Sequence, residues 1–146
     1  MKKLDILSMN DAGVFAITAN TLDANHAYAV LKFKREGRKA FDSIMDSERA
    51  ILEEVGITNP PAFDREREQL TKSQENPTRL EELNNTFNRF SELRKALYEE
   101  KIELELTPLP YEQFHAIQVE NKDLPNKPLN VFEDLLEGVL WIAPEE

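Results

Sequence analysis

Residues 24–55 read ANHAYAVLKFKREGRKAFDSIMDSERAILEEV, and their apolar residues recur at intervals of three and four. This spacing places one apolar face along a helix, so it predicts a single long amphipathic helix. Asp23 precedes the segment as a cap signal and Gly56 follows it as a C-terminal glycine. The main apolar row is Ala27, Val30, Lys34, Gly37, Phe41, Ile44, Glu48, Ile51 and Val55, and a neighbouring row is Leu31, Met45 and Leu52.

Residues 80–97 repeat the same spacing, so the two segments are expected to pack as a long antiparallel helical hairpin. Pairing Val55 with Leu80 sets the register and places Gly37 opposite Leu97 and Tyr98, where a missing side chain admits a large one. The same register pairs Asp42 with Arg94, Asp46 with Arg89, and the basic run 32–39 with glutamates in 99–103.

The rest of the chain is expected to cap this hairpin with a small antiparallel β-sheet. Residues 101–107 alternate apolar and charged side chains, which is typical of a strand, and Leu4–Leu7 is the expected partner strand. Ala116–Val119 is a candidate third strand, and a C-terminal helix is expected from Asn130. The fold class is therefore mainly α (α+β), in one domain spanning residues 1–146.

The connection of residues 56–78 is polar and contains Asn59-Pro60-Pro61, which cannot lie inside a helix. Phe63, Arg67 and Leu70 have the spacing of one short amphipathic helix within it. Thr78, with Glu81 three residues later, predicts the start of the second long helix.

Composition excludes several classes of function. The net charge of −10 and a pI near 4.8 disfavour direct binding to nucleic acids and to anionic membranes. The absence of cysteine excludes disulfides, thiol catalysis and cysteine-based zinc sites. No apolar run is long enough to span a membrane, and Asp5, Asn10 and Asp11 interrupt any signal-peptide core. A cytoplasmic protein is expected.

The order of elements resembles a family of small phage and prophage proteins of unknown function. The resemblance covers roughly residues 3–118 and rests on short strings, namely Leu7-Ser8-Met9-Asn10-Asp11-Ala12, Ile102-x-Leu104-x-Leu106, Leu109-Pro110 and Phe114. It implies a phage or mobile-element setting, and it implies no catalytic residues. The insert at 56–77 and the C-terminal helix are departures from the family's pattern.

No motif indicates a catalytic site or a cofactor. His26 and His115 have no partner that the sequence places beside them, and the chain has too few glycines for a phosphate-binding loop. The acidic doublets Glu53-Glu54, Glu81-Glu82 and Glu99-Glu100 resemble those of all-α nucleotide pyrophosphohydrolases, but the second acidic motif of such enzymes is missing. Solvated acidic surface is the preferred interpretation, and no metal or cofactor is expected.

Two groups of residues are candidate contacts for a protein partner. The first is the basic run Lys32, Lys34, Arg35, Arg38 and Lys39, whose simpler interpretation is pairing with glutamates of the facing helix. The second is Trp141 with Ile142, whose simpler interpretation is a tryptophan that closes the core.

Three functions remain open. The preferred one is a non-catalytic protein–protein interaction module, with self-association as one form of it. The second is an acidic decoy that imitates DNA and occupies a host nucleic-acid-binding protein. The third, and least favoured, is a metal-dependent nucleotide hydrolase.

Overall fold

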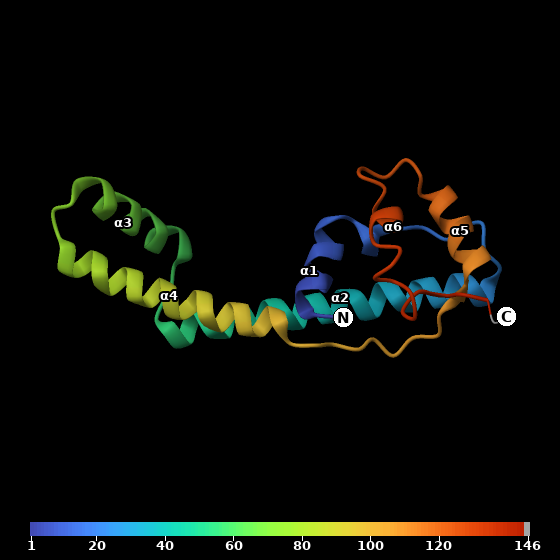
Figure 1. Cartoon of the computed structure of the whole chain (residues 1–146), viewed down its shortest axis with the longest axis horizontal. Coiled ribbons are helices and arrows are strands. Elements are labelled where there is room, and N and C mark those ends of the chain that lie inside the picture. Colours follow the sequence, from blue (N-terminus) through green and yellow to red (C-terminus); the bar gives the residue numbers. More distant parts are fainter. Residues whose placement is uncertain (145–146) are drawn as a thin grey trace. The chain divides into compact units, whose positions relative to one another are not determined.

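A computed structural model of the chain describes residues 1–144 (Figure 1). Within these residues the protein is mainly helical, as predicted, with six α-helices, one 3-10 turn and two strands of two residues each. The helices are α1 (Lys3–Asp11), α2 (Ala24–Val55), α3 (Pro60–Ser73), α4 (Pro77–Glu99), α5 (Tyr111–Glu120) and α6 (Pro128–Val131). The other elements are η1 (Val14–Ala16), β1 (Leu109–Pro110) and β2 (Trp141–Ile142).

The chain contains two compact units. The first comprises Met1–Ser43 and Lys101–Glu146, and the second comprises Ile44–Glu100. The first part of α2 therefore belongs to one unit and its last part to the other. That residues 1–146 form a single domain stays a prediction.

Helix α2 begins and ends where the sequence predicts. The Asp23 carboxylate accepts a hydrogen bond of 3.0 Å from the His26 backbone N–H, which satisfies one of the free amides of the first turn. Gly56 follows the last helical residue with φ of +85°, a conformation that glycine adopts without a steric penalty.

The N-terminal strand expected at Leu4–Leu7 is wrong, because these residues lie in α1. Ile6 and Met9 are three positions apart and fully buried, so a helix buries both on one face. The Asp5 carboxylate accepts from the Lys2 backbone N–H at 2.8 Å and caps the start of the helix. A short apolar run does not distinguish strand from helix by periodicity alone, and the capping residue decided it.

Close packing of α2 on η1 explains Gly37. A β-carbon at Gly37 would lie 2.6 Å from Cδ1 of Phe15 and nearer still to other atoms of that ring. The missing side chain does admit a large one, as predicted, but that side chain is Phe15 rather than Leu97 or Tyr98.

The predicted antiparallel sheet is also wrong. Residues 101–107 form no strand; Lys101 makes one isolated bridge to Lys2, and the Ile102 N–H donates to the Met1 carbonyl at 2.9 Å. Because α1 takes up the next residues, the alternating segment has no strand to pair with. The sheet within residues 1–144 is instead the parallel pair β1–β2, and the expected third strand, 116–119, lies in α5.

Residues 56–78 are mostly helical rather than a polar connection. Asn59 caps α3 by accepting from Ala62 N–H at 3.1 Å, and the two prolines occupy its first positions, where no N–H is needed. Asn76, not Thr78, caps α4 in the same way. Figure 1 shows α3 lying antiparallel along α4, and the two helices are in contact.

The register expected between the two long helices is wrong. The Tyr98 hydroxyl donates to Glu48 at 2.7 Å, about three helical turns from its expected position opposite Gly37. Arg89 pairs with Glu54 at 3.4 Å rather than with Asp46, which pairs with Arg49. Ion pairs between exposed residues contribute little free energy and select a helix register only weakly. The opposite charges on the two helices therefore could not reveal that the pairing of Val55 with Leu80 was wrong. A hairpin along the full predicted length stays a prediction.

The expected C-terminal helix is reduced to α6, which has four residues. Turns follow it, and Gly138 adopts φ of +78° before the chain enters β2. Leu136 and Leu140 are nonetheless buried, with exposed fractions of 0% and 2%. Of the apolar residues expected to face inward from this helix, Leu136 and Leu140 do so, although turns bury them instead of a helix. Phe132, Leu135 and Val139 are only partly buried, and Val131 is 68% exposed, so the expectation is wrong for Val131.

Candidate protein-binding face

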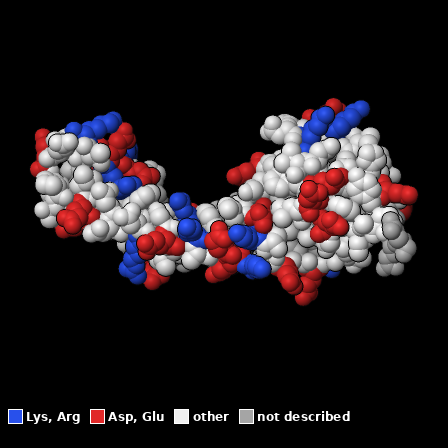
Figure 2. Space-filling view, viewed as in Figure 1, with Lys and Arg blue, Asp and Glu red and all other residues white. Residues whose placement is uncertain are grey.

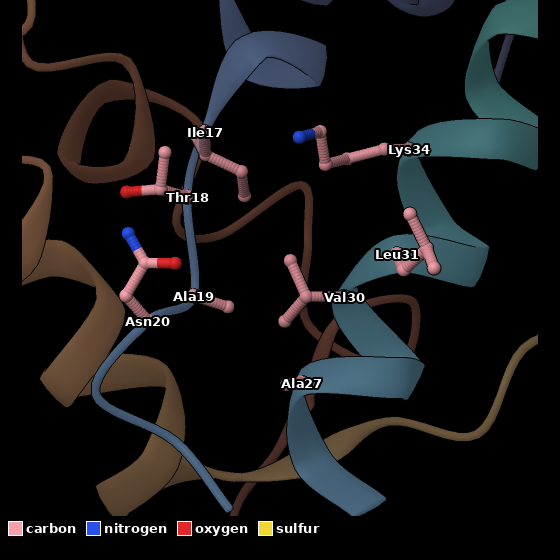
Figure 3. A pocket seen from close by; sticks show the side chains of 8 residues that line it. All are labelled: Ile17, Thr18, Ala19, Asn20, Ala27, Val30, Leu31 and Lys34. Atoms are coloured by element: carbon pink, nitrogen blue, oxygen red, sulfur yellow. The ribbon is translucent and has the colours of Figure 1, made fainter. Parts of the chain in front are cut away.

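A cavity of about 240 Å³ lies in the first unit between the start of α2 and the segment that precedes it. Figure 3 shows the Lys34 side chain reaching from α2 into this space, which is otherwise lined mainly by apolar side chains. We call it the Lys34 cavity. Its lining residues are Ile17, Thr18, Ala19, Asn20, Ala27, Val30, Leu31 and Lys34.

The wall formed by residues 17–21 is held by the end of α5. The Asn121 side chain, only 8% exposed, accepts from Thr18 N–H at 2.9 Å and donates to the Thr18 carbonyl at 2.8 Å. The Glu120 carboxylate accepts from the Thr18 hydroxyl, from Asn20 N–H at 3.0 Å and from Thr21 N–H at 2.7 Å. The wall is therefore fixed from outside, and three of its backbone amides have their hydrogen bonds satisfied.

These hydrogen bonds set the charge state of Glu120. Partial burial raises the pKa of its carboxyl, but the bonds from Thr18, Asn20 and Thr21 outweigh this and lower the pKa to about 2. Each of them favours the carboxylate over the neutral acid. Glu120 is thus a charged structural anchor at neutral pH.

Lys34 is a half-buried cation without a counter-ion. Within residues 1–144 its ammonium has neither a hydrogen bond nor an ion pair. Partial burial, with a smaller contribution from the like charge of Arg38, lowers the pKa of Lys34 below its ordinary value. The cavity therefore offers one unsatisfied positive charge beside apolar walls.

An exposed apolar strip borders this cavity. Tyr28 and Leu31 are 59% and 48% exposed, although both are large hydrophobic residues. With Arg35 they follow one another at intervals of three and four, so they share one face of α2. We call these three residues the α2 ridge. Leu31 was expected in the neighbouring row that widens the apolar, buried face of the helix, and its exposure shows that this expectation is wrong.

A second hollow lies beside Tyr28. It measures about 350 Å³ and is lined by Asn25, His26, Tyr28, Ala29, Lys32 and residues 107–110. Leu31 lines the Lys34 cavity and Tyr28 lines this second hollow, so the α2 ridge lies between two hollows of the first unit.

The five basic candidates do not act as one group. Lys34 enters the cavity, Lys32 lines the second hollow, and Arg35 is exposed on the ridge. Arg38 donates to the Phe15 carbonyl at 2.8 Å, and Lys39 pairs with Glu36 on its own helix at 3.5 Å. The simpler interpretation, pairing with glutamates of a facing helix, does not describe Arg38 or Lys39.

The C-terminal candidates separate as well. Trp141 donates from its indole to the Glu133 carbonyl at 2.7 Å and packs on Tyr111 and Phe114, so it has a structural role. Ile142 is 52% exposed and lines a hollow of about 590 Å³ with Pro110 and neighbouring residues. The charged residue that lines this hollow beside Ile142 is Glu112, an anion, so the hollow has no counterpart to the Lys34 ammonium.

The two histidines make local contacts. His26 Nδ1 lies 2.7 Å from Asp23 at the start of α2, and His115 Nδ1 lies 3.2 Å from Gln118. Of the acidic doublets, Glu54 pairs with Arg89 and Glu82 with Arg79. Across residues 1–144, histidine and acidic side chains nowhere gather in threes that could hold a metal ion. Over the same residues, no helix has the length and apolarity needed to cross a membrane.

Comparison with known proteins adds no assignment: no protein-family model, curated protein or solved structure matches the chain.

Sequence reasoning placed Lys34 among the candidates but missed Tyr28, Glu120 and Asn121. One signal for the cavity was present, because Lys34 occupies the apolar row of α2, where an aliphatic residue is expected. Tyr28 lies off that row and could have been read as an exposed aromatic. Glu120 and Asn121 act on residues about a hundred positions away, and no local pattern reveals such contacts.

Proposed function

We propose that the protein is a non-catalytic interaction module and that the α2 ridge with the Lys34 cavity is its binding face for an acidic protein partner. The observation that carries this proposal is that the exposed Leu31 lines the cavity that holds the unpaired ammonium of Lys34, with the exposed Tyr28 next to Leu31 on the same face of α2. Large apolar side chains surrounded by polar groups are typical of binding surfaces.

Charge gives the chemistry of the partner. Residues 31–40 contain five basic residues and one acidic residue, in a chain whose net charge is −10. An acidic partner would be repelled by most of this protein's surface and attracted at this segment. Complementary charge of this kind selects the partner and its orientation more than it adds affinity.

The phage or mobile-element setting is proposed on the sequence resemblance of residues 3–118 alone. The DNA-imitating decoy finds no comparable support, because Figure 2 shows the acidic side chains of the face viewed in small separate groups, many of them next to basic ones, rather than in one continuous row. Nucleotide hydrolysis likewise has no cluster of carboxylates within residues 1–144 to support it.

The test is a capture experiment with matched variants. The tagged protein is incubated with lysate of the cells that produce it, and captured proteins are identified, purified and measured for direct binding. Leu31→Asp removes an apolar contact and adds a like charge for an acidic partner, so we expect binding to weaken at least about tenfold. The control is Val131→Asp, which alters an equally apolar residue that is 68% exposed and lies in α6.

We expect one protein that binds the wild type and Val131→Asp equally and loses affinity for Leu31→Asp. Equal binding by all three proteins would refute the proposed face. Size-exclusion chromatography with light scattering, run on the same variants, shows whether the partner is a second copy of this chain.

A further inference from the structure

The Lys34 cavity has the features of a site for one specific group of atoms. It combines a single ammonium that has no partner within residues 1–144 with apolar walls from Val30 and Leu31. Figure 3 shows the ammonium inside the cavity rather than directed away from it. A ligand group that enters must therefore be anionic where it meets Lys34 and apolar beside it.

The cavity wall distinguishes a carboxylate from a phosphate. Phosphate sites in proteins gather several donors, often backbone N–H groups. Here the N–H groups of Thr18, Asn20 and Thr21 already donate to Asn121 and Glu120. The Thr18 hydroxyl also donates to Glu120. Besides the ammonium, the side-chain amide of Asn20 also lines the cavity. One ammonium with a single side-chain amide, and with these backbone N–H groups already used, matches a group that carries one negative charge.

The spacing along α2 indicates how the partner presents this group. Leu31 and Lys34 are three positions apart, so they lie about 5–6 Å apart on the helix surface. A partner helix that lies along the ridge presents a glutamate and a leucine at the same separation when they are four positions apart. The cavity volume of about 240 Å³ is equivalent to about eight water molecules, which is enough for a carboxylate and its methylene groups.

We propose that the Lys34 cavity receives the carboxylate of a glutamate side chain from an amphipathic helix of the partner, while an apolar residue one turn away covers Leu31 and Tyr28. This assignment rests on the proposed function and names the partner's chemistry. The ammonium–carboxylate contact forms on binding, and the apolar contact excludes water from it.

The probe is a synthetic helical peptide with glutamate and leucine four positions apart on an otherwise polar face. Binding is measured by titration into isotope-labelled full-length protein with backbone and lysine-side-chain NMR. We expect saturable shifts at Lys34, Leu31 and Val30. The same peptide with glutamine in place of glutamate should bind about 10- to 100-fold more weakly, because a charge-assisted hydrogen bond is lost.

Matched variants assign the charge contact to one lysine. Lys34→Gln should weaken the glutamate peptide by the same factor and should leave the glutamine peptide unchanged, since the two changes remove one shared contact. Lys39→Gln is the control, because Lys39 is exposed and paired with Glu36. Inorganic phosphate at matched ionic strength should not displace the peptide, whereas displacement by phosphate would overturn the choice of carboxylate.

Failure of this assignment is distinguishable from failure of the proposed function. If capture of the partner depends on Leu31 but the peptide binds equally with glutamine, or does not bind, the carboxylate assignment is overturned and the binding face stands. If the peptide binds through Lys34 but capture is indifferent to Leu31→Asp, the cavity assignment stands and the proposed function fails. Thermal melts of each variant establish that it is folded.

Discussion

Replacing Gly37 by alanine sets two known effects against each other, and the structure predicts which is larger. Alanine is a better helix former than glycine by about 1 kcal/mol, so a Gly→Ala change in an exposed helix is stabilising. At Gly37 the new β-carbon would overlap the Phe15 ring, with Cδ1 only 2.6 Å away. The outcome depends on whether Phe15 can move.

The surroundings of Phe15 oppose that movement. Its ring is 2% exposed and lies 5.4 Å from the ring of Phe33, which is fully buried. Its carbonyl holds the Arg38 guanidinium at 2.8 Å, so the backbone is tied as well. Overpacking a core in this way costs about 1–3 kcal/mol, and expelling a large side chain costs a similar amount. Since the new β-carbon would lie well under 3 Å from several atoms of the ring, the cost belongs in the upper part of this range, about 2–3 kcal/mol. Subtracting the gain of about 1 kcal/mol in helix propensity, we expect Gly37→Ala to destabilise the protein by about 1–2 kcal/mol.

Thermal unfolding measures this change. A chain of this length loses about 2–4 °C in Tm for each kcal/mol, so a decrease of about 2–8 °C is expected. Ser43→Ala, on an exposed position of α2, is the control that reports helix propensity alone. Introduced into a Phe15→Leu background, Gly37→Ala should become stabilising, because the clash is relieved. A rise in Tm from Gly37→Ala in the wild-type background would refute the packing of Phe15 against α2.

Three further predictions concern other parts of the fold. The pKa of Glu120 is lowered to about 2 in the folded protein, so its stabilisation is fully present above its ordinary pKa of 4.5 and is lost as pH falls toward 2. In acid unfolding, the stability of Glu120→Gln should therefore fall less steeply than that of the wild type between pH 5 and 2. Phe90→Asp places a charge where the wild-type side chain is 7% exposed, and it should abolish cooperative unfolding in a thermal melt. Lys39→Ala alters a side chain that is 69% exposed, and it should change Tm by less than about 2 °C. Burial and the hydrogen bond to Glu48 raise the pKa of Tyr98 to about 12, and the hydrogen bond to Glu133 raises that of Tyr111 as well. Ultraviolet titration should therefore show an ionisation near pH 12 that Tyr98→Phe removes, and the stabilisation by Tyr98 should be lost only as pH rises from 10 toward 12.

The sequence predicts a helix well where one face is apolar over many turns. Residues 24–55 satisfy this condition, and both ends of α2 carry capping residues whose chemistry is local. The same reasoning failed for 101–107, where alternation describes a segment able to pair but cannot supply a partner strand. It failed again at Asn59, where an asparagine followed by proline was interpreted as a break rather than as a cap and first helical residue. Asn76, also followed by proline, caps α4 in the same way, whereas the sequence reasoning chose Thr78.

The candidate site was only partly predictable, for a related reason. Lys34 was a candidate only as a member of the basic run, although a lysine in an apolar row is a local anomaly of the sequence that could have singled it out. The cavity around it depends on residues 17–21, and these are positioned by Glu120 and Asn121 at the far end of a different helix. Hydrogen bonds between such distant residues follow from the tertiary fold and leave no periodic signal. The α2 ridge could not be predicted either, because Leu31 was expected to be buried on the basis of the spacing of apolar residues around it.

The position of Lys34 leads to a final prediction with two opposite signs. A half-buried ammonium without a counter-ion is desolvated in the free protein, so it disfavours the folded state. Lys34→Gln should therefore leave the thermal stability of the free protein unchanged or raise it, while it weakens binding of an acidic partner. Lys39→Gln should alter neither quantity. A lysine that served only the fold would behave differently, because its loss would lower Tm and affect binding only through that decrease. Melting and binding measurements on the same two variants thus separate a binding residue from a structural one. If the charge of Lys34 destabilises the free protein but strengthens the complex, the favourable contribution must come from contacts with the partner.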